Sequence, residues 1–107
     1  TAMIMQPEYV TEELFNRAIE QVQIKKGLSS LSKIKFKILY EGLSVQLMYV
    51  GSYSAEGPTI EKLHNFIKEN GYKLRGKHHE IYLSDPRRSA PEKLKTVIRQ
   101  PVMSAGL

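Results

Sequence analysis

The side chains best suited to chemistry lie in one short run, His78 to Leu83, which reads His-His-Glu-Ile-Tyr-Leu. The run predicts a strand, in which successive side chains point to opposite faces of a sheet. We therefore expect Ile81 and Leu83 to pack on the helices. Glu80 and Tyr82, together with His78, are expected on the other face.

Two further tyrosines, Tyr49 and Tyr53, share one face of an earlier predicted strand. If that face coincides with the face of Glu80, a carboxylate lies among aromatic rings. Such a pocket binds a cation or an aromatic compound, because the carboxylate supplies charge and the rings supply stacking and hydrogen bonds. A buried Glu also has a raised pKa, which suits a general acid or base. The alternative is a solvated sheet face that carries an isolated Glu.

Other kinds of site have little support. His78 and His79 are neighbours on a strand and point to opposite faces, and His64 has Lys68 rather than a ligand at the next helical turn, so we expect no metal. The chain contains no cysteine, which excludes a disulfide, a Cys-ligated metal centre and a thiol nucleophile. No serine lies in a Gly-x-Ser-x-Gly turn, and no glycine-rich loop is present, so we expect no cofactor.

The chain is moderately basic. Its 107 residues include 16 Lys and Arg against 11 Asp and Glu, which gives a net charge of +5. The basic residues of the last third are Arg87, Arg88, Lys93, Lys95 and Arg99. They could meet phosphates, but no helix-turn-helix or zinc-finger pattern accompanies them, so a solvated face is favoured over nucleic acid. We find no membrane-length apolar run and no signal peptide, and we expect a cytoplasmic protein without membrane contact.

Local patterns predict the elements that position these residues. The pattern predicts a helix over about 11–26 that Thr11 caps and Gly27 ends. Alternating residues then predict a strand over 34–40 and another over 45–53, joined as an antiparallel hairpin.

The second half of the chain continues with a helix from Pro58 to Asn70, whose buried stripe is Ile60, Leu63, Phe66 and Ile67. We expect one strand from Tyr72 to Leu83, a helical turn from Pro91 to Lys95, and a last strand from Thr96 to Val102. Pro101 suggests that this strand lies at an edge. The predicted fold class is α+β, with an antiparallel four-stranded sheet and helices packed on one face.

The sequence resembles the GyrI-like small-molecule-binding family, relatives of the effector domains of multidrug-sensing and AraC-type bacterial regulators. The matching residues are Val45–Tyr53, Glu56, Thr59-Ile60, Gly71-Tyr72, His78–Arg88 and Leu94–Val102. The His-His-Glu-Ile-Tyr-Leu-Ser-Asp-Pro run is the most specific of them. The resemblance covers 34–102 well, and 1–26 resembles the helix that links the halves of that fold.

The resemblance implies two similar α+β modules around a pseudo-two-fold axis, with a ligand cleft between them. This chain then comprises a linking helix and loop over 1–33 and the second module over 34–107. A second copy, in a symmetric dimer, or a missing N-terminal module would complete the cleft. Glu80 is the residue that would meet cationic xenobiotics, and Tyr82 would line the same cleft. Tyr49 stands where relatives often carry His.

The resemblance also implies two alternatives to plain binding. Stand-alone members are linked to hydrolysis of cyclopropane-containing toxins by a cleft Glu and a Tyr. By that analogy Glu80 is the acid or base, and Tyr40 or Tyr53 is its partner. The family name further suggests inhibition of a topoisomerase through protein contact, with the basic segment from Arg87 to Arg99 as the surface.

Overall fold

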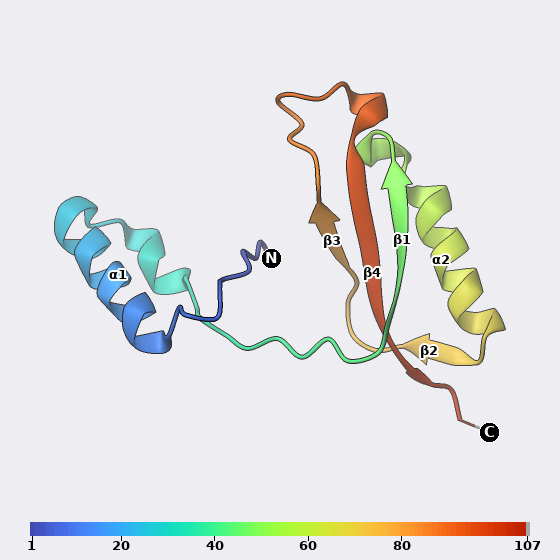
Figure 1. Ribbon diagram of the computed structural model, residues 1–107, viewed down its shortest axis with the longest axis horizontal. Helices are drawn as coiled ribbons and strands as arrows, with labels where there is room; N and C mark the ends of the chain where they lie inside the picture. The colour runs from blue at the N-terminus through green and yellow to red at the C-terminus, as the bar shows by residue number, and fades with distance from the viewer. Residues whose placement is uncertain (107) are drawn as a thin grey trace. The chain divides into compact units, whose positions relative to one another are not determined.

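The computed structural model of the chain describes residues 1–106. The chain divides into two compact units, Thr1–Leu39 and Tyr40–Leu107, and each is described by itself (Figure 1). Within residues 1–106, no helix combines the length and the apolar character that crossing a membrane requires.

The first unit contains helix α1 (Glu12–Lys26), as its capping residues predict. The Thr11 side chain accepts a hydrogen bond of 3.2 Å from the backbone N–H of Leu14. At the other end Gly27 adopts φ 56°, a left-handed conformation that glycine reaches at little cost. The first-turn glutamates and last-turn lysines complement the helix dipole, so this helix is specified locally.

The predicted strand over 34–40 is wrong, and so is the hairpin with 45–53. Among the described residues, the first strand is β1 (Ser44–Val50). The ring of Phe36 stacks instead on Phe15 of α1, with the ring centroids 5.4 Å apart. Alternation predicts an extended backbone, but a strand also needs a neighbouring strand for its hydrogen bonds. The expected partner of 34–40 was the strand that forms β1, and β1 pairs with β4 (Lys95–Ser104) instead.

The sheet of the second unit is organised around β4 (Lys95–Ser104). β1 pairs with β4 in antiparallel fashion along its whole length, while β2 (Tyr72–Leu74) and β3 (His79–Tyr82) both pair with the opposite edge of β4 (Figure 1). The α+β class and the antiparallel four-stranded sheet are confirmed. The expectation that the last strand is an edge strand is wrong, because β4 lies at the centre.

A break in the neighbouring strand lets Pro101 lie within a central strand. The single strand predicted over 72–83 is interrupted between β2 and β3, and the gap faces Pro101. The side-chain amide of Gln100, which is 2% exposed, donates to the carbonyl oxygens of Gly76 at 3.1 Å and Pro101 at 2.8 Å. Arg75 N–H also donates to Pro101 O at 2.9 Å. The missing proline N–H therefore coincides with a gap in the ladder.

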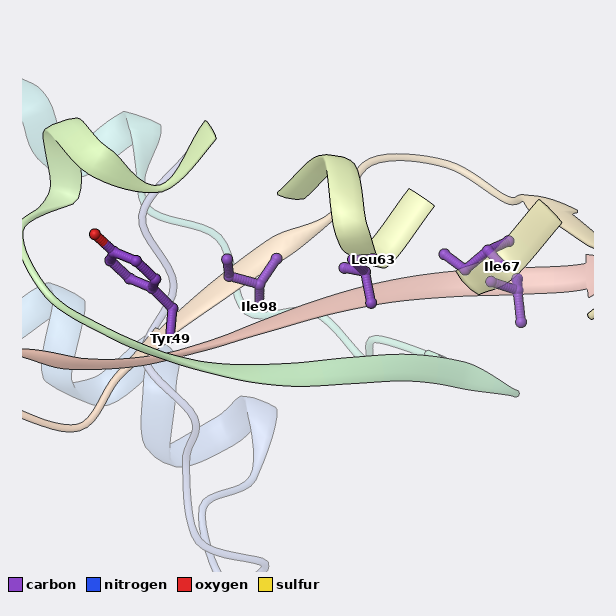
Figure 2. Close-up of a cluster of buried hydrophobic side chains, with 5 residues drawn as sticks. Tyr49, Leu63, Ile67 and Ile98 are labelled. Carbon is purple, nitrogen blue, oxygen red and sulfur yellow. The ribbon is translucent and has the colours of Figure 1, made fainter. Parts of the chain in front are cut away.

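Helix α2 (Gly57–Glu69) covers one face of this sheet. Its Leu63 and Ile67 form the core with Tyr49, Ile98 and Val102 from the strands (Figure 2). These residues are at most 9% exposed, so they supply most of the hydrophobic free energy of folding in this unit.

The ends of α2 agree with the sequence, since Pro58 lies in its first turn and Gly71 follows it with φ 79°. The prediction that Phe66 belongs to the buried stripe of α2 is wrong. Phe66 is 53% exposed, because it lies at the margin of the face that meets the sheet. The predicted helical turn near Pro91 is present as a short 3₁₀ turn, η3 (Pro91–Lys93).

We expect Ile98→Ala to lower the free energy of unfolding by about 3 kcal/mol, because Ile98 is fully buried and its loss leaves a cavity. Met48→Ala is the control, since Met48 is 48% exposed on the other face and should cost about 1 kcal/mol or less. Urea denaturation of both variants measures the difference. Equal losses would contradict the assignment of the core to the α2 face.

Candidate functional site

Strand pairing places Glu80 and Tyr82 on the face of the sheet that α2 covers. Glu80 is paired with Ile98 and Tyr82 with Thr96, and directly paired residues share a face. Ile98 and Thr96 are both fully buried. The expectation that Ile81 packs on the helices is therefore wrong. Alternation separates two sets of side chains but does not tell which set is buried.

The Glu80 carboxylate is bonded to one tyrosine, which in turn meets a second. Tyr82 donates its hydroxyl hydrogen to Oε2 of Glu80 at 2.8 Å. The ring of Tyr82 in turn lies 5.3 Å from the ring of Tyr53, centroid to centroid, with the planes tilted by 59°. Tyr53 begins a short 3₁₀ turn, η2 (Tyr53–Ala55), directly before α2. The structure thus joins Glu80 directly to Tyr82, and joins Tyr53 to Glu80 only through the ring of Tyr82.

A second carboxyl group, that of Glu56, completes this cluster. Glu56 immediately precedes α2, is 7% exposed, and makes no side-chain hydrogen bond to the helix end. Burial, a hydrogen bond with Glu80 and the charge of Glu80, in that order of size, together raise the pKa of Glu56 to about 7. Below about pH 7 this group therefore holds a proton beside the Glu80 carboxylate.

The pKa of Glu80 moves the other way. The hydrogen bond with Glu56 lowers it most, burial opposes this, and the Tyr82 hydroxyl and the charge of His78 lower it further. The bond to Glu80 correspondingly raises the pKa of Tyr82. The cluster thus combines an ionised carboxylate with a neighbouring carboxyl group that keeps its proton, which is the pattern of a divided acid and base pair.

Sequence reasoning gave no role to Glu56, although the residue belongs to the run that resembles the family. The only available signal was its position two residues before Pro58, at the start of the predicted helix. A Glu at such a position is usually solvated, so the sequence does not predict its burial. Burial depends on the approach of β3, which no local pattern shows.

The other predicted site residues make no direct hydrogen bond or ring contact with Glu80 among the residues that the structure describes. Tyr49 lies on the same face, but it is 9% exposed and its hydroxyl donates to Ser52 O at 2.7 Å, so it belongs to the core. His78 is exposed and precedes β3. Tyr40 is 83% exposed, and among the described residues no hydrogen bond or ring contact joins it to Glu80.

A separate charged cluster lies around Glu41, outside the Glu80 site. Nε2 of His79 lies 2.7 Å from Oε1 of Glu41, and Arg99 Nη1 donates to Oε2 of Glu41 at 2.9 Å. Arg75 also donates to the backbone carbonyl of Glu41. These contacts attach the segment before β1 to β3 and β4. Within residues 1–106, no group of three or more His, Asp or Glu side chains is arranged to hold a metal ion.

The chain is similar to known proteins in sequence and in fold. The profile of the family described as GyrI-like small molecule binding domain matches residues 3–103, nearly the whole chain. The chain belongs to the GyrI-like family. None of the curated proteins is a significant match to this GyrI-like sequence.

Two solved structures from Listeria innocua share the fold of this GyrI-like chain. One is described as a hydrolase, with 41% sequence identity and a TM-score of 0.79 over 92% of this chain and 52% of its own. The other is described as an uncharacterized conserved protein, with 43% identity and a TM-score of 0.83 over 92% of this chain and 50% of its own. The chain thus spans about half the length of these structures.

The raised pKa of Glu56 predicts how stability depends on pH in this GyrI-like domain. The ordinary pKa of Glu is 4.5, so between that value and about 7 the folded state holds a proton that the unfolded state has lost. Stability therefore falls as pH rises through this window. Glu56→Gln removes the titration, so its stability relative to the parent should increase by about 2 kcal/mol from about pH 5 to pH 8.

Urea denaturation at the two pH values measures this change. Glu61→Gln, at an exposed position of α2, is the matched control and should show no such trend. A stability difference between Glu56→Gln and the parent that does not change with pH would contradict the raised pKa.

Proposed function

We propose that this GyrI-like domain binds small aromatic cations at Glu80, Tyr82 and Tyr53. The observation that carries the proposal is the ionised Glu80 carboxylate held by the Tyr82 hydroxyl at 2.8 Å, beside a pair of tyrosine rings. The family match supports small-molecule binding in general, and the charge at this cluster supports a cation.

The exposure of the rings supports access by a ligand. Tyr82 is 59% exposed and Tyr53 is 40% exposed, while Glu80 below them is half-buried. A planar cation can therefore stack on the rings and place its charge over the carboxylate. Cation–π contact and a partly desolvated ion pair each favour such a ligand by about 1 kcal/mol or more. In this proposal Tyr49 supports the floor of the site, and His78 acts only through its charge.

A single open face covers only part of a ligand, so the proposal includes a second layer. We propose that either another module of the same protein or a second copy of the chain closes the cleft over Glu80. The matched structures are about twice as long as this chain, which supports the first arrangement. A cytoplasmic location and a bacterial regulator or xenobiotic-binding role stay predictions.

Substitution of Glu80 tests the binding role. We expect Glu80→Gln to weaken binding of aromatic cations at least about tenfold, because the variant keeps the shape of the site and loses its charge. Ligand-induced thermal shift and calorimetry on the full-length protein measure the effect. Glu92→Gln, in the exposed turn η3, is the matched control and should bind like the parent. If Glu80→Gln and the control bind a cation panel equally, the proposed role of Glu80 fails.

A second candidate function is hydrolysis of a strained, electrophilic ring such as a cyclopropane. The specific observation in its favour is the carboxyl pair, in which Glu80 is ionised while Glu56 retains a proton to about pH 7. One matched structure is also described as a hydrolase. In this reaction Glu80 accepts a proton as the water oxygen bonds to an electrophilic ring carbon. The ring C–C bond breaks, its electron pair remains on the other carbon, and Glu56 protonates that carbon.

The tyrosine partner in this candidate reaction is Tyr82, with Tyr53 against its ring, rather than Tyr40. Tyr82 already donates to the carboxylate, whereas Tyr40 lies exposed in the segment before β1. The protein-interaction alternative has no comparable support, since Arg87 of the basic segment pairs with Asp85 of its own turn at 3.1 Å.

Turnover separates hydrolysis from binding. We expect a full-length enzyme to add water to a cyclopropane-bearing substrate, and Glu80→Gln to lower kcat about 100-fold or more. Product formation followed by mass spectrometry in isotopically labelled water identifies the added oxygen. Turnover that is unchanged in Glu80→Gln would exclude this residue as the base, and Glu92→Gln controls for nonspecific loss.

A further inference from the structure

The two carboxyl groups of Glu56 and Glu80 are hydrogen-bonded to each other, and Glu56 is 7% exposed. Within residues 1–106 the ion pairs of Lys, Arg and His side chains lie elsewhere, on Glu13, Glu41 and Asp85. An ionised carboxylate only accepts hydrogen bonds, so a bond between two carboxyl groups requires a proton on one of them. The proton is therefore the counter-charge of this pair.

The two carboxyl groups differ in how a ligand can reach them. The Tyr82 hydroxyl donates to Oε2 of Glu80, and the exposed rings of Tyr82 and Tyr53 meet beside it. Glu56 lies at the start of α2, and its Oε1 is closed to solvent. In the proposed function a cation on the rings meets Glu80, and it acts on Glu56 only through its charge.

We propose that a bound cation displaces the proton of the carboxyl pair, so that binding releases a proton from Glu56 and strengthens as pH rises through neutrality. This inference rests on the proposed binding function and adds the regulation of that site by pH. The O–H bond of Glu56 breaks, its electron pair stays on the carboxylate oxygen, and the proton passes to the solvent. The ligand is not changed chemically.

The charge of the ligand explains the coupling and its sign. Burial, the hydrogen bond with Glu80 and the charge of Glu80 raise the pKa of Glu56 to about 7. A cation beside Glu80 opposes the effect of that charge, and a neighbouring charge shifts a pKa by about one unit or more. By linkage, a ligand that lowers the pKa of Glu56 binds more tightly where Glu56 is ionised, which is above about pH 7.

His78 is a second group whose charge could influence binding in the same pH range. The charge of His78 lowers the pKa of Glu80, and histidine side chains change charge near neutral pH. A charged His78 repels a cation, so the loss of its proton would also strengthen binding as pH rises. The effect of Glu56 is therefore measured in a protein that lacks His78.

The other neighbours do not explain such a pH dependence. Tyr82 keeps its proton near neutral pH, because the bond to Glu80 raises its pKa from 10.0. The further titratable or charged side chains of the surrounding elements are Tyr49 of β1, Tyr53 of η2, and Glu61, Lys62 and His64 of α2. Among the described residues, none of these shifts the pKa of either carboxyl group.

The test measures the affinity of N-methylquinolinium, a planar ion whose charge does not depend on pH, by calorimetry on the full-length protein. In the His78→Gln protein we expect about fivefold tighter binding at pH 8 than at pH 6. At pH 7 the heats measured in phosphate and in HEPES should differ, because the buffer takes up about 0.4 of a proton per ligand bound.

Glu56→Gln, made in the His78→Gln protein, is the decisive variant, because it keeps the shape and a donor to Glu80 but has no proton to release. It should bind as tightly as its background at pH 6 and show no gain at pH 8. Glu61→Gln, at an exposed position of α2, is the matched control and should keep the gain. Thermal unfolding at both pH values checks that each variant is folded.

The outcomes distinguish this inference from the proposed function. If affinity in the His78→Gln protein does not change with pH, or if the gain persists in Glu56→Gln, the role of Glu56 is overturned. The binding function then still stands, provided that Glu80→Gln weakens binding. If N-methylquinolinium does not bind the parent protein, or binds Glu80→Gln equally well, the proposed function fails and the inference fails with it.

Discussion

The hydrogen bonds of β4 hold the second unit together, because every other strand of its sheet pairs with β4. β1 occupies one edge, and β2 and β3 share the other. A central strand that contains Pro101 is possible only because the ladder is interrupted there and Gln100 turns its side-chain amide to the free carbonyls. The same interruption separates β3 from β2. Strand β3 contributes Glu80 and Tyr82 to the candidate site, and none of its residues belongs to the buried core.

The pairing of β3 with β4 also decides what surrounds Glu80. Ile98 and Thr96 face α2 and are fully buried, so their partners Glu80 and Tyr82 must lie on that face as well. Helix α2 covers the β1 side of the face, and its start brings Glu56 and Tyr53 toward β3. The site is therefore formed at the margin of the core, beside the start of α2 and the two exposed tyrosine rings.

Two carboxyl groups in contact at such a margin reduce stability near neutral pH. Burial and the neighbouring charge both disfavour ionisation of Glu56, so Glu56 keeps its proton up to about pH 7. Proteins tolerate this kind of local cost where a ligand or a reaction uses it.

The sequence by itself determined the features that depend on near neighbours. These are the capped helix after Thr11, the helix after Pro58, the strand character of β1 and β4, and the common face of Glu80 and Tyr82, all of which follow from local spacing. Only the tertiary structure decided that the segment over 34–40 forms no strand, that β4 is central, and that Glu56 meets Glu80. The physical reason is that strand pairing and burial join residues far apart in the chain, and alternation is the same whichever partner or face is chosen.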